Sequence, residues 1–361
     1  MRPSEKTASD EGLENLLVNC AGITKGTRVL VVNESDTIMV EPATVELIEQ
    51  KARTLGAEVR SIWAGAIAGP ESIPETIVDA IGEAQVSIFN HSLGGMLRLR
   101  PMPGKGIGVL NYATTREIME SAWARVPYGL WKQIAKAITG ELNQSRNWHI
   151  TCPRGTDLRG SVPESERQSV ATPSGFSLHT FPIGTHQPTS SVTANGTLAM
   201  RWLASSANHD VGDGLRLDTS IVASVADGRI TDLEGGKIQV DAARKYLEEI
   251  GTRYGKDPYL LNSWHGGTNP LAFTPSRDTV HLNWWQLLVH NNPRTLHFHA
   301  IGHEMPGEIS LPVLDPTVTI DDEVVWDRGR FAILQRPSVQ DLLKTWPAKQ
   351  DIFTLNNAIG L

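Results

Sequence analysis

Histidines near the carboxyl end of the chain have the spacing that most directly suggests chemistry. His297 and His299 flank Phe298 within residues 295–301, a stretch that reads as a β-strand. Residues two apart in a strand project from the same face, so both imidazoles would point one way and Phe298 the other. Two convergent imidazoles, with a third ligand from another segment, can hold a catalytic divalent metal with open positions. The alternative is a polar strand face that carries two hydrogen-bonded histidines.

His265 is the candidate for the third imidazole. It lies where a predicted strand over residues 258–264 runs into a loop that contains Gly266 and Gly267. Glycine lets the backbone approach a ligand closely, so a histidine at this junction could reach the face that carries the His297 pair. The alternative is a loop histidine whose neighbouring glycines only serve a turn.

Three further residues have weaker signals. Glu234 ends a predicted strand before two glycines, and it could be a metal ligand or a general base. A carboxylate in that position is more commonly a turn or capping residue. His281 and His290 flank a predicted helix, where a histidine is more commonly a surface or core residue than a ligand.

The first 145 residues alternate between strand-like and helix-like patterns. Predicted strands cover residues 28–32, 58–63, 85–90 and 106–110, and predicted helices cover 12–21, 42–55, 73–82, 112–123 and 128–142. This alternation predicts an α/β fold with a doubly wound parallel sheet. Ligands of such sheets lie beyond the carboxyl ends of the strands, and residues 90–95, which include His91, follow the third predicted strand.

The pattern changes near residue 145. Short strand candidates separated by Gly, Ser, Thr and Pro follow, with helices predicted over residues 237–251 and 280–290. This pattern predicts an α+β domain with antiparallel pairing, which would carry the metal site. The predicted domains are therefore 1–145, Rossmann-like, and 146–361, catalytic.

Composition excludes several classes of protein. The 361 residues include 33 basic and 40 acidic side chains, so no basic surface is expected to neutralise nucleic-acid phosphates. Two cysteines are too few for a disulfide framework or a four-thiolate zinc site. The polar amino terminus lacks a signal sequence, and the apolar runs are shorter than the ~20 residues of a membrane span. We expect a cytoplasmic protein without nucleic-acid or membrane partners.

Taken together, the segments resemble the aminopeptidase T clan of metallohydrolases, and within it the 2,5-dihydroxypyridine 5,6-dioxygenase family. The resemblance is colinear over roughly residues 81–330, and the shared order of short motifs carries it. In chain order, the matching points are His91-Ser92, His149-Ile150 before Gly155-Thr156-Asp157, Pro173-Ser174-Gly175-Phe176, Phe181-Pro182, Gly196-Thr197-Leu198, Val211-Gly212-Asp213, Asp227-Gly228-Arg229-Ile230, Glu234-Gly235-Gly236, His265-Gly266, the His297 pair and Ile320-Asp321-Asp322.

This resemblance implies a function and a set of site residues. The metal ligands would be His265, His297 and His299, and His91 would contact the substrate or oxygen. The cofactor would be a divalent metal, with Fe(II) favoured over Zn or Mn, and the substrate a small aromatic molecule. Members of the family assemble as homo-oligomers, so we expect the same here.

Two positions depart from the family pattern. The family has an acidic residue at the position of His299, so this chain has HxH in place of HxD. A neutral ligand there leaves the metal centre one unit more positive, unless Glu234 joins the ligands. Arg159 stands where the family has a second histidine, and its guanidinium could pair with an anionic group of the substrate in a bidentate manner.

Three functions are consistent with these residues. The first is a ring-cleaving dioxygenase, with His91 as the base for a ring hydroxyl and Arg159 holding an anionic substituent. The second is a metal-dependent amidase, deaminase or aminopeptidase, because three imidazoles suit a metal-bound water nucleophile. The third is a binding protein that has kept the scaffold and lost the metal.

Overall fold

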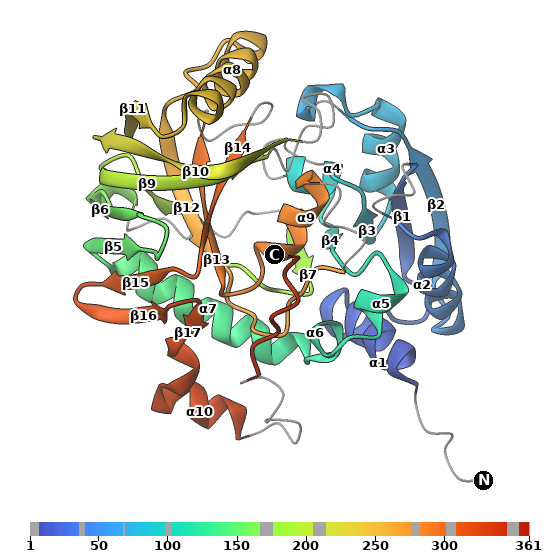
Figure 1. Ribbon diagram of the computed structural model, residues 1–361. Helices are drawn as coiled ribbons and strands as arrows, with labels where there is room; N and C mark the ends of the chain where they lie inside the picture. The colour runs from blue at the N-terminus through green and yellow to red at the C-terminus, as the bar shows by residue number, and fades with distance from the viewer. Residues whose placement is uncertain are drawn as a thin grey trace. The chain divides into compact units, whose positions relative to one another are not determined.

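A parallel sheet forms in the amino-terminal half of the chain (Figure 1). The computed structural model describes residues 7–35, 40–67, 69–97, 103–166, 176–204, 214–275, 282–300, 308–344 and 354–360. The sheet has the strand order β2-β1-β3-β4-β7, and every neighbouring pair is parallel. Its strands are β1 (Arg28–Glu34), β2 (Glu58–Ala64), β3 (Val86–Asn90), β4 (Ile107–Asn111) and β7 (Ser177–Phe181).

Helices connect these strands, as the alternating pattern predicts. Among them, α2 (Pro42–Thr54) has proline in its first turn, where the absent N–H costs no helical bond, and Gly56 follows its end at φ +84°. The other helical segments in this part are α1 (Ala8–Glu14), the π-helix η1 (Asn15–Cys20), the 3₁₀ turn η2 (Pro70–Ser72), α3 (Glu75–Glu83), α4 (Leu93–Met96), α5 (Arg116–Met119) and α6 (Ala122–Arg125).

The single helix predicted over residues 112–123 is wrong. The structure has two one-turn helices there, α5 and α6. The Thr115 side chain accepts from the N–H of Ile118, and the Ser121 side chain accepts from the N–H of Ala124. Each hydroxyl therefore begins a new helix, because side-chain capping competes with helix continuation.

The chain divides into two compact units, and the first is discontinuous in sequence. It comprises Met1–Lys132 and Ala171–Ile183, and the second comprises Gln133–Val170 and Gly184–Leu361. The reason is β7, which returns to pair with β4 in the parallel sheet. The domain limits predicted from the sequence, 1–145 and 146–361, do not include this return, and they stay a prediction.

The second unit contains two antiparallel sheets. An eight-stranded sheet has the order β11-β10-β9-β6-β5-β15-β16-β17, and a four-stranded sheet has the order β14-β13-β12-β8. The strands are β5 (Asn147–Thr151), β6 (Asp157–Ser161), β8 (Thr189–Ser190), β9 (Asn195–Leu203), β10 (Leu215–Ala226), β11 (Arg229–Glu234), β12 (Leu261–Gly266), β13 (Thr295–Ala300), β14 (Ile309–Leu314), β15 (Thr317–Ile320), β16 (Glu323–Asp327) and β17 (Arg330–Phe331).

Few helices accompany these sheets. The longest, α8 (Lys237–Tyr254), packs against β10 and ends at Gly255, whose φ of +62° is the left-handed conformation that favours glycine (Figure 1). The remaining helical segments are α7 (Tyr128–Gln144), η3 (Glu164–Glu166), α9 (Leu282–Val289), η6 (Ala332–Gln335) and α10 (Pro337–Leu343). Within the described residues, we find no helix with the length and apolar character of a membrane span.

Large aromatic side chains fill the core between the two antiparallel sheets. Trp264 of β12 lies with its ring centre 5.9 Å from that of Trp148 on β5 and 6.2 Å from that of Trp326 on β16. Phe298 of β13 lies 6.2 Å from Trp148, and all four rings are buried. This core fixes which face of β12 and β13 is turned away from the eight-stranded sheet.

Candidate metal centre

The opposite face of β12 and β13 carries three histidines. In the antiparallel register, His265 lies directly across from His297, and Ser263 lies across from His299. Because side chains alternate along a strand, Trp264 and Phe298 enter the aromatic core while the histidines share the other face. The ring nitrogens of the three histidines that could bind a metal all lie within 4.8 Å of one another. The structure thus brings together the three predicted metal ligands, whose role as ligands stays a prediction.

Hydrogen bonds set the orientation of two of these rings. Nδ1 of His265 lies 3.1 Å from the carbonyl oxygen of His186, which can only accept a hydrogen bond, so Nδ1 carries the proton and Nε2 keeps its lone pair. Nδ1 of His299 lies 2.9 Å from Oγ of Ser263, and the Nε2 atoms of His265 and His299 are 3.0 Å apart. A backbone or side-chain partner on one nitrogen, with the other turned inward, is the usual arrangement of metal-bound histidine.

His297 is held by stacking. The ring of His290, which follows α9, lies parallel to it at 9°, with the ring centres 3.6 Å apart. Within the described part of the chain, neither Nδ1 of His297 nor Nε2 of His290 has a hydrogen-bond partner. Both are buried, and a buried polar atom without a partner costs about 1–3 kcal/mol. A metal ion or another ligand bound at this position would supply the missing partner.

The cluster favours neutral imidazoles. Burial lowers the pKa of His297 well below its usual range, and the neighbouring histidines lower it further. Burial likewise lowers the pKa of His290 to about 3 and that of His186 to about 4. A neutral imidazole is the form that binds a metal, so burial prepares the donor atom of His297, and a divalent ion fits the set of three ring nitrogens.

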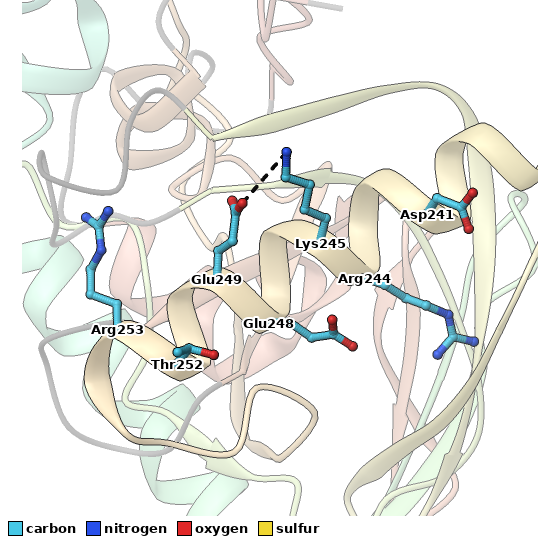
Figure 2. Close-up of a pocket in the computed structure, with 7 residues that line it drawn as sticks. All are labelled: Asp241, Arg244, Lys245, Glu248, Glu249, Thr252 and Arg253. Atoms are coloured by element: carbon cyan, nitrogen blue, oxygen red, sulfur yellow. Dashed lines mark ion pairs between the residues drawn. The ribbon is translucent and has the colours of Figure 1, made fainter.

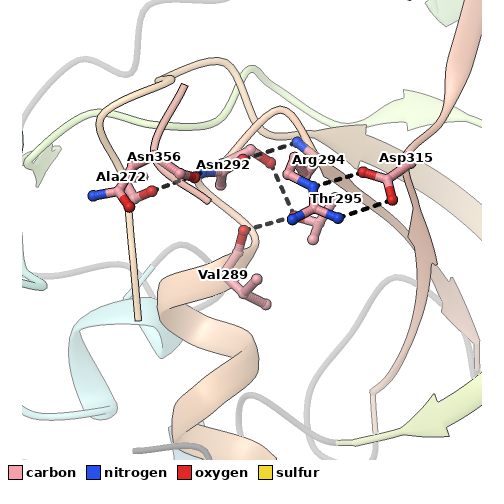
Figure 3. Close-up of polar contacts among 7 residues, drawn as sticks. All are labelled: Ala272, Val289, Asn292, Arg294, Thr295, Asp315 and Asn356. Atoms are coloured by element: carbon pink, nitrogen blue, oxygen red, sulfur yellow. Dashed lines mark hydrogen bonds and ion pairs between the residues drawn. The ribbon is translucent and has the colours of Figure 1, made fainter. Parts of the chain in front are cut away.

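Polar contacts fix the start of β13, and Figure 3 shows them. Oγ1 of Thr295 donates to the carbonyl of Val289 at 2.6 Å, and Asn292 closes the turn between α9 and β13. The guanidinium of Arg294 makes two bonds to Asp315, at 2.7 and 3.0 Å. These contacts tie the strand that carries the histidine pair to α9 on one side and to the segment after β14 on the other.

The carboxyl-terminal segment holds α9 in place. Nε1 of Trp285 donates to the carbonyl of Ile359 at 2.7 Å, and Nδ2 of Asn292 donates to the carbonyl of Asn356 at 2.8 Å (Figure 3). Trp285 also packs on Trp202, with ring centres 5.6 Å apart. Trp285 and Trp202 therefore serve core packing.

A carboxylate that the sequence did not indicate lies beside the triad. Glu308 directly precedes β14, which pairs with β13, and its Oε1 lies 3.1 Å from Nε2 of His299. No sequence pattern could have found it, because the strand register that brings it to His299 is a tertiary property.

Arg159 and Glu234 lie on the eight-stranded sheet. Arg159 is on β6 with its side chain 70% exposed, 3.9 Å from Asp157, and Glu234 is exposed at the end of β11 on the edge of that sheet. The structure does not bring either residue into the three-histidine cluster, so their predicted roles in substrate binding and catalysis stay predictions.

His91 lies in the first unit, in a closed set of polar contacts. Nδ1 accepts from the N–H of Leu93 at 3.0 Å and lies 3.3 Å from the carboxylate of Glu34, while Nε2 lies 3.1 Å from the carbonyl of Gly65. Both ring nitrogens are thus engaged within this unit. Its predicted role as a base stays a prediction.

An asparagine ladder crosses the carboxyl ends of the parallel strands. Nδ2 of Asn111 donates to Asn90, and Nδ2 of Asn90 donates to Asn33, both at 2.8 Å. Nδ2 of Asn33 in turn donates to Ser61 at 3.0 Å. The edge of the sheet where ligands usually bind is therefore occupied by amides that satisfy one another.

A broad surface hollow runs along α8 (Figure 2). Charged side chains of this helix line it, including Lys245 and Glu249, which form an ion pair of 3.7 Å with both side chains exposed. Exposed pairs four residues apart are ordinary features of a solvated helix face. This hollow brings together none of the predicted site residues.

Comparisons with known proteins agree with the predicted fold. The chain is similar to the solved structure of 2,5-dihydroxypyridine dioxygenase from Pseudomonas putida, with a TM-score of 0.61 and 16% sequence identity over 90% of this chain and 96% of that chain. No protein-family model matches the sequence, and no curated protein matches it. At this identity the likeness shows the fold, and the wider resemblance to aminopeptidase T stays a prediction.

Proposed function

We propose that the chain is a metal-dependent enzyme that binds one divalent ion through His265, His297 and His299. Three observations support this: the ring nitrogens lie within 4.8 Å of one another, the carbonyl of His186 orients one ring, and burial lowers the pKa of His297, which favours its neutral form. The first of these carries the proposal, because three buried imidazoles from two paired strands have no role in the aromatic core.

The activity that we infer is ring cleavage of a small hydroxylated aromatic or heteroaromatic acid by O₂. The support is that the fold resembles that of a dioxygenase for a dihydroxypyridine over nearly the whole of both chains. An Fe(II) ion held by the triad would supply open positions for a ring hydroxyl and for O₂. Both oxygen atoms then enter the product, so the reaction consumes no external reductant.

The residues around the triad have defined tasks in this proposal. His186 and Ser263 hold two of the rings through Nδ1, and His290 fixes the plane of the third by stacking. The aromatic core behind β12 and β13 excludes water from the back of the site. The donor atoms are therefore positioned before the substrate arrives, which avoids reorganisation during the reaction.

A metal-dependent hydrolase is the second candidate. The observation that favours it is the ligand set, because three neutral imidazoles suit a metal that activates water. The two candidates differ in a measurable way: oxygenation consumes O₂ and hydrolysis does not.

The test is turnover of a panel of hydroxylated pyridine and benzoic acids by protein loaded with Fe(II) or Zn(II), followed by ring absorbance and an oxygen electrode. We expect loss of ring absorbance with equimolar O₂ uptake for the Fe(II) protein and no reaction under nitrogen. The variant His297→Ala should be inactive, while His149→Ala, which changes a histidine on the eight-stranded sheet, should be active. Turnover that persists without O₂ would support the hydrolase instead.

A further inference from the structure

The carboxylate of Glu308 points at the ring nitrogen of His299 that faces the cluster. Glu308 precedes β14, and the residue two positions later, Ser310, pairs with His299 in the register of β13 and β14. The side chain of Glu308 is only 14% exposed, and its Oε1 lies 3.1 Å from Nε2 of His299. Nδ1 of the same ring is engaged by Ser263, so the carboxylate meets the nitrogen that faces inward.

Three inward-facing polar atoms lie close together in the cluster. Nε2 of His299 lies 3.0 Å from Nε2 of His265 and 3.1 Å from the carboxylate of Glu308. Nε2 of His265 is an acceptor, because Nδ1 of that ring donates to a carbonyl, and the carboxylate is an acceptor as well. The atoms that meet here are therefore ones that can donate electron pairs to a metal ion.

These separations match the ligand shell of a metal. Metal bonds to imidazole nitrogen and carboxylate oxygen are about 2.0–2.2 Å long, so ligand atoms at right angles to each other lie about 3.0 Å apart. The observed separations of 3.0 and 3.1 Å agree with this value.

The charge of a metal ion also favours a carboxylate ligand. Imidazole ligands carry no negative charge, so three of them leave both positive charges of a divalent ion uncompensated at a buried position, where an unpaired charge is costly. We propose that Glu308 is a fourth ligand, so that the metal centre consists of three imidazoles and one carboxylate. This inference rests on the metal centre of the proposed function and adds the source of its negative charge.

Mixed nitrogen and oxygen donors suit a divalent ion such as Fe²⁺, Mn²⁺ or Zn²⁺ better than a soft ion such as Cu⁺.

The test measures binding of Co(II) to metal-free protein, by competition with a chromophoric chelator and by the visible ligand-field spectrum. We expect Glu308→Gln to bind Co(II) roughly 100-fold more weakly, the upper end of the 10–100-fold that loss of an outer-shell partner costs, and to change the spectrum. Glu308→Asp, which keeps the carboxylate, should recover part of the affinity. The matched control is Glu249→Gln, whose exposed carboxylate lies on α8, and it should bind as the unchanged protein does.

Each outcome decides one point. If Glu308→Gln keeps both affinity and spectrum while His297→Ala loses binding, the metal centre stands and Glu308 is not its ligand. If the unchanged protein binds Co(II) no better than His297→Ala, the metal centre itself is refuted, and the inference falls with it. Near-ultraviolet circular dichroism of the metal-free variants shows whether they fold, and Glu308→Asp decides the matter if Glu308→Gln does not.

Discussion

The asparagine ladder of the first unit and the histidine cluster of the second are both buried and polar, but they differ in how their hydrogen bonds are arranged. In the ladder, Asn90 both donates and accepts, and its neighbours Asn33 and Asn111 are bonded in turn. In the cluster, Nδ1 of His297 and Nε2 of His290 have no hydrogen-bond partner among the described residues.

Buried polar groups are of two kinds here: those that bond to one another, and those that remain able to bind a ligand. Buried polar groups that satisfy one another stabilise a fold and specify its packing. Groups that are held in place yet lack partners cost stability, and proteins retain such arrangements chiefly at functional sites. We therefore infer a structural role for the ladder and, under the proposed function, a ligand-binding role for the cluster.

The largest effect is expected for the variant His297→Ala. It removes one of the proposed ligands, so metal affinity should fall by more than about 100-fold, beyond the cost of losing an outer-shell partner. Metal content after dialysis, measured by elemental analysis, checks this. Retention of the metal by His297→Ala would remove the cluster from the class of ligand sites.

The ladder should respond in the opposite way. Asn90→Ala removes the acceptor of one N–H of Asn111, whose Nδ2 keeps its bond to the carbonyl of Ala113, and the donor to Oδ1 of Asn33, at about 1–3 kcal/mol each. We expect the free energy of unfolding in urea to fall by about 3 kcal/mol while metal content is unchanged. Gln50→Ala, which removes an exposed amide of α2, is the control and should have little effect. A loss of metal in Asn90→Ala would contradict the assignment.

Part of the pH dependence of stability should come from His186 in the second unit. His186 has a pKa lowered to about 4 against about 6.5 in an unfolded chain, so the unfolded state binds a proton that the folded state does not. Its contribution is present above pH 7 and is lost as the pH falls, by about 2 kcal/mol at pH 5. Urea unfolding of metal-free protein at pH 7.5 and 5 should show a smaller difference in His186→Gln than in His149→Gln. Equal differences in the two variants would refute this contribution.

The smallest expected effect concerns the support of β13. Arg294→Ala removes the two bonds to Asp315 in a partly exposed pair, so we expect a loss of about 1 kcal/mol. The control Lys237→Ala breaks an exposed pair on α8 and should change stability by less than about 0.5 kcal/mol. Thermal unfolding of both variants measures the contrast, and an equal effect of the two changes would show that the anchor of β13 is unimportant.

Local patterns could predict the histidine face, because it depends only on strand alternation. Residues two apart in β13 share a face, so His297, His299 and the buried position of Phe298 followed from the sequence. The parallel sheet followed from strand and helix alternation in the same way. Both features depend on the identity of neighbouring residues along the chain.

Features that depend on strand pairing could not be predicted. Glu308 reaches His299 through the register of β13 and β14, and His290 stacks on His297 because of where α9 lies. The shared order of motifs placed Arg159 and Glu234 near the site, but order along a chain does not say which sheet a strand joins. The structure puts both on the eight-stranded sheet.

The return of β7 to the parallel sheet has a consequence for how the chain matures during synthesis. The amino-terminal unit lacks its edge strand until Phe181 has left the ribosome, although β4 is complete seventy residues earlier. Throughout that interval β4 presents unpaired backbone groups, which are a template for association with other chains. A fragment that stops at residue 145 keeps this edge permanently, so we expect it to associate with other chains.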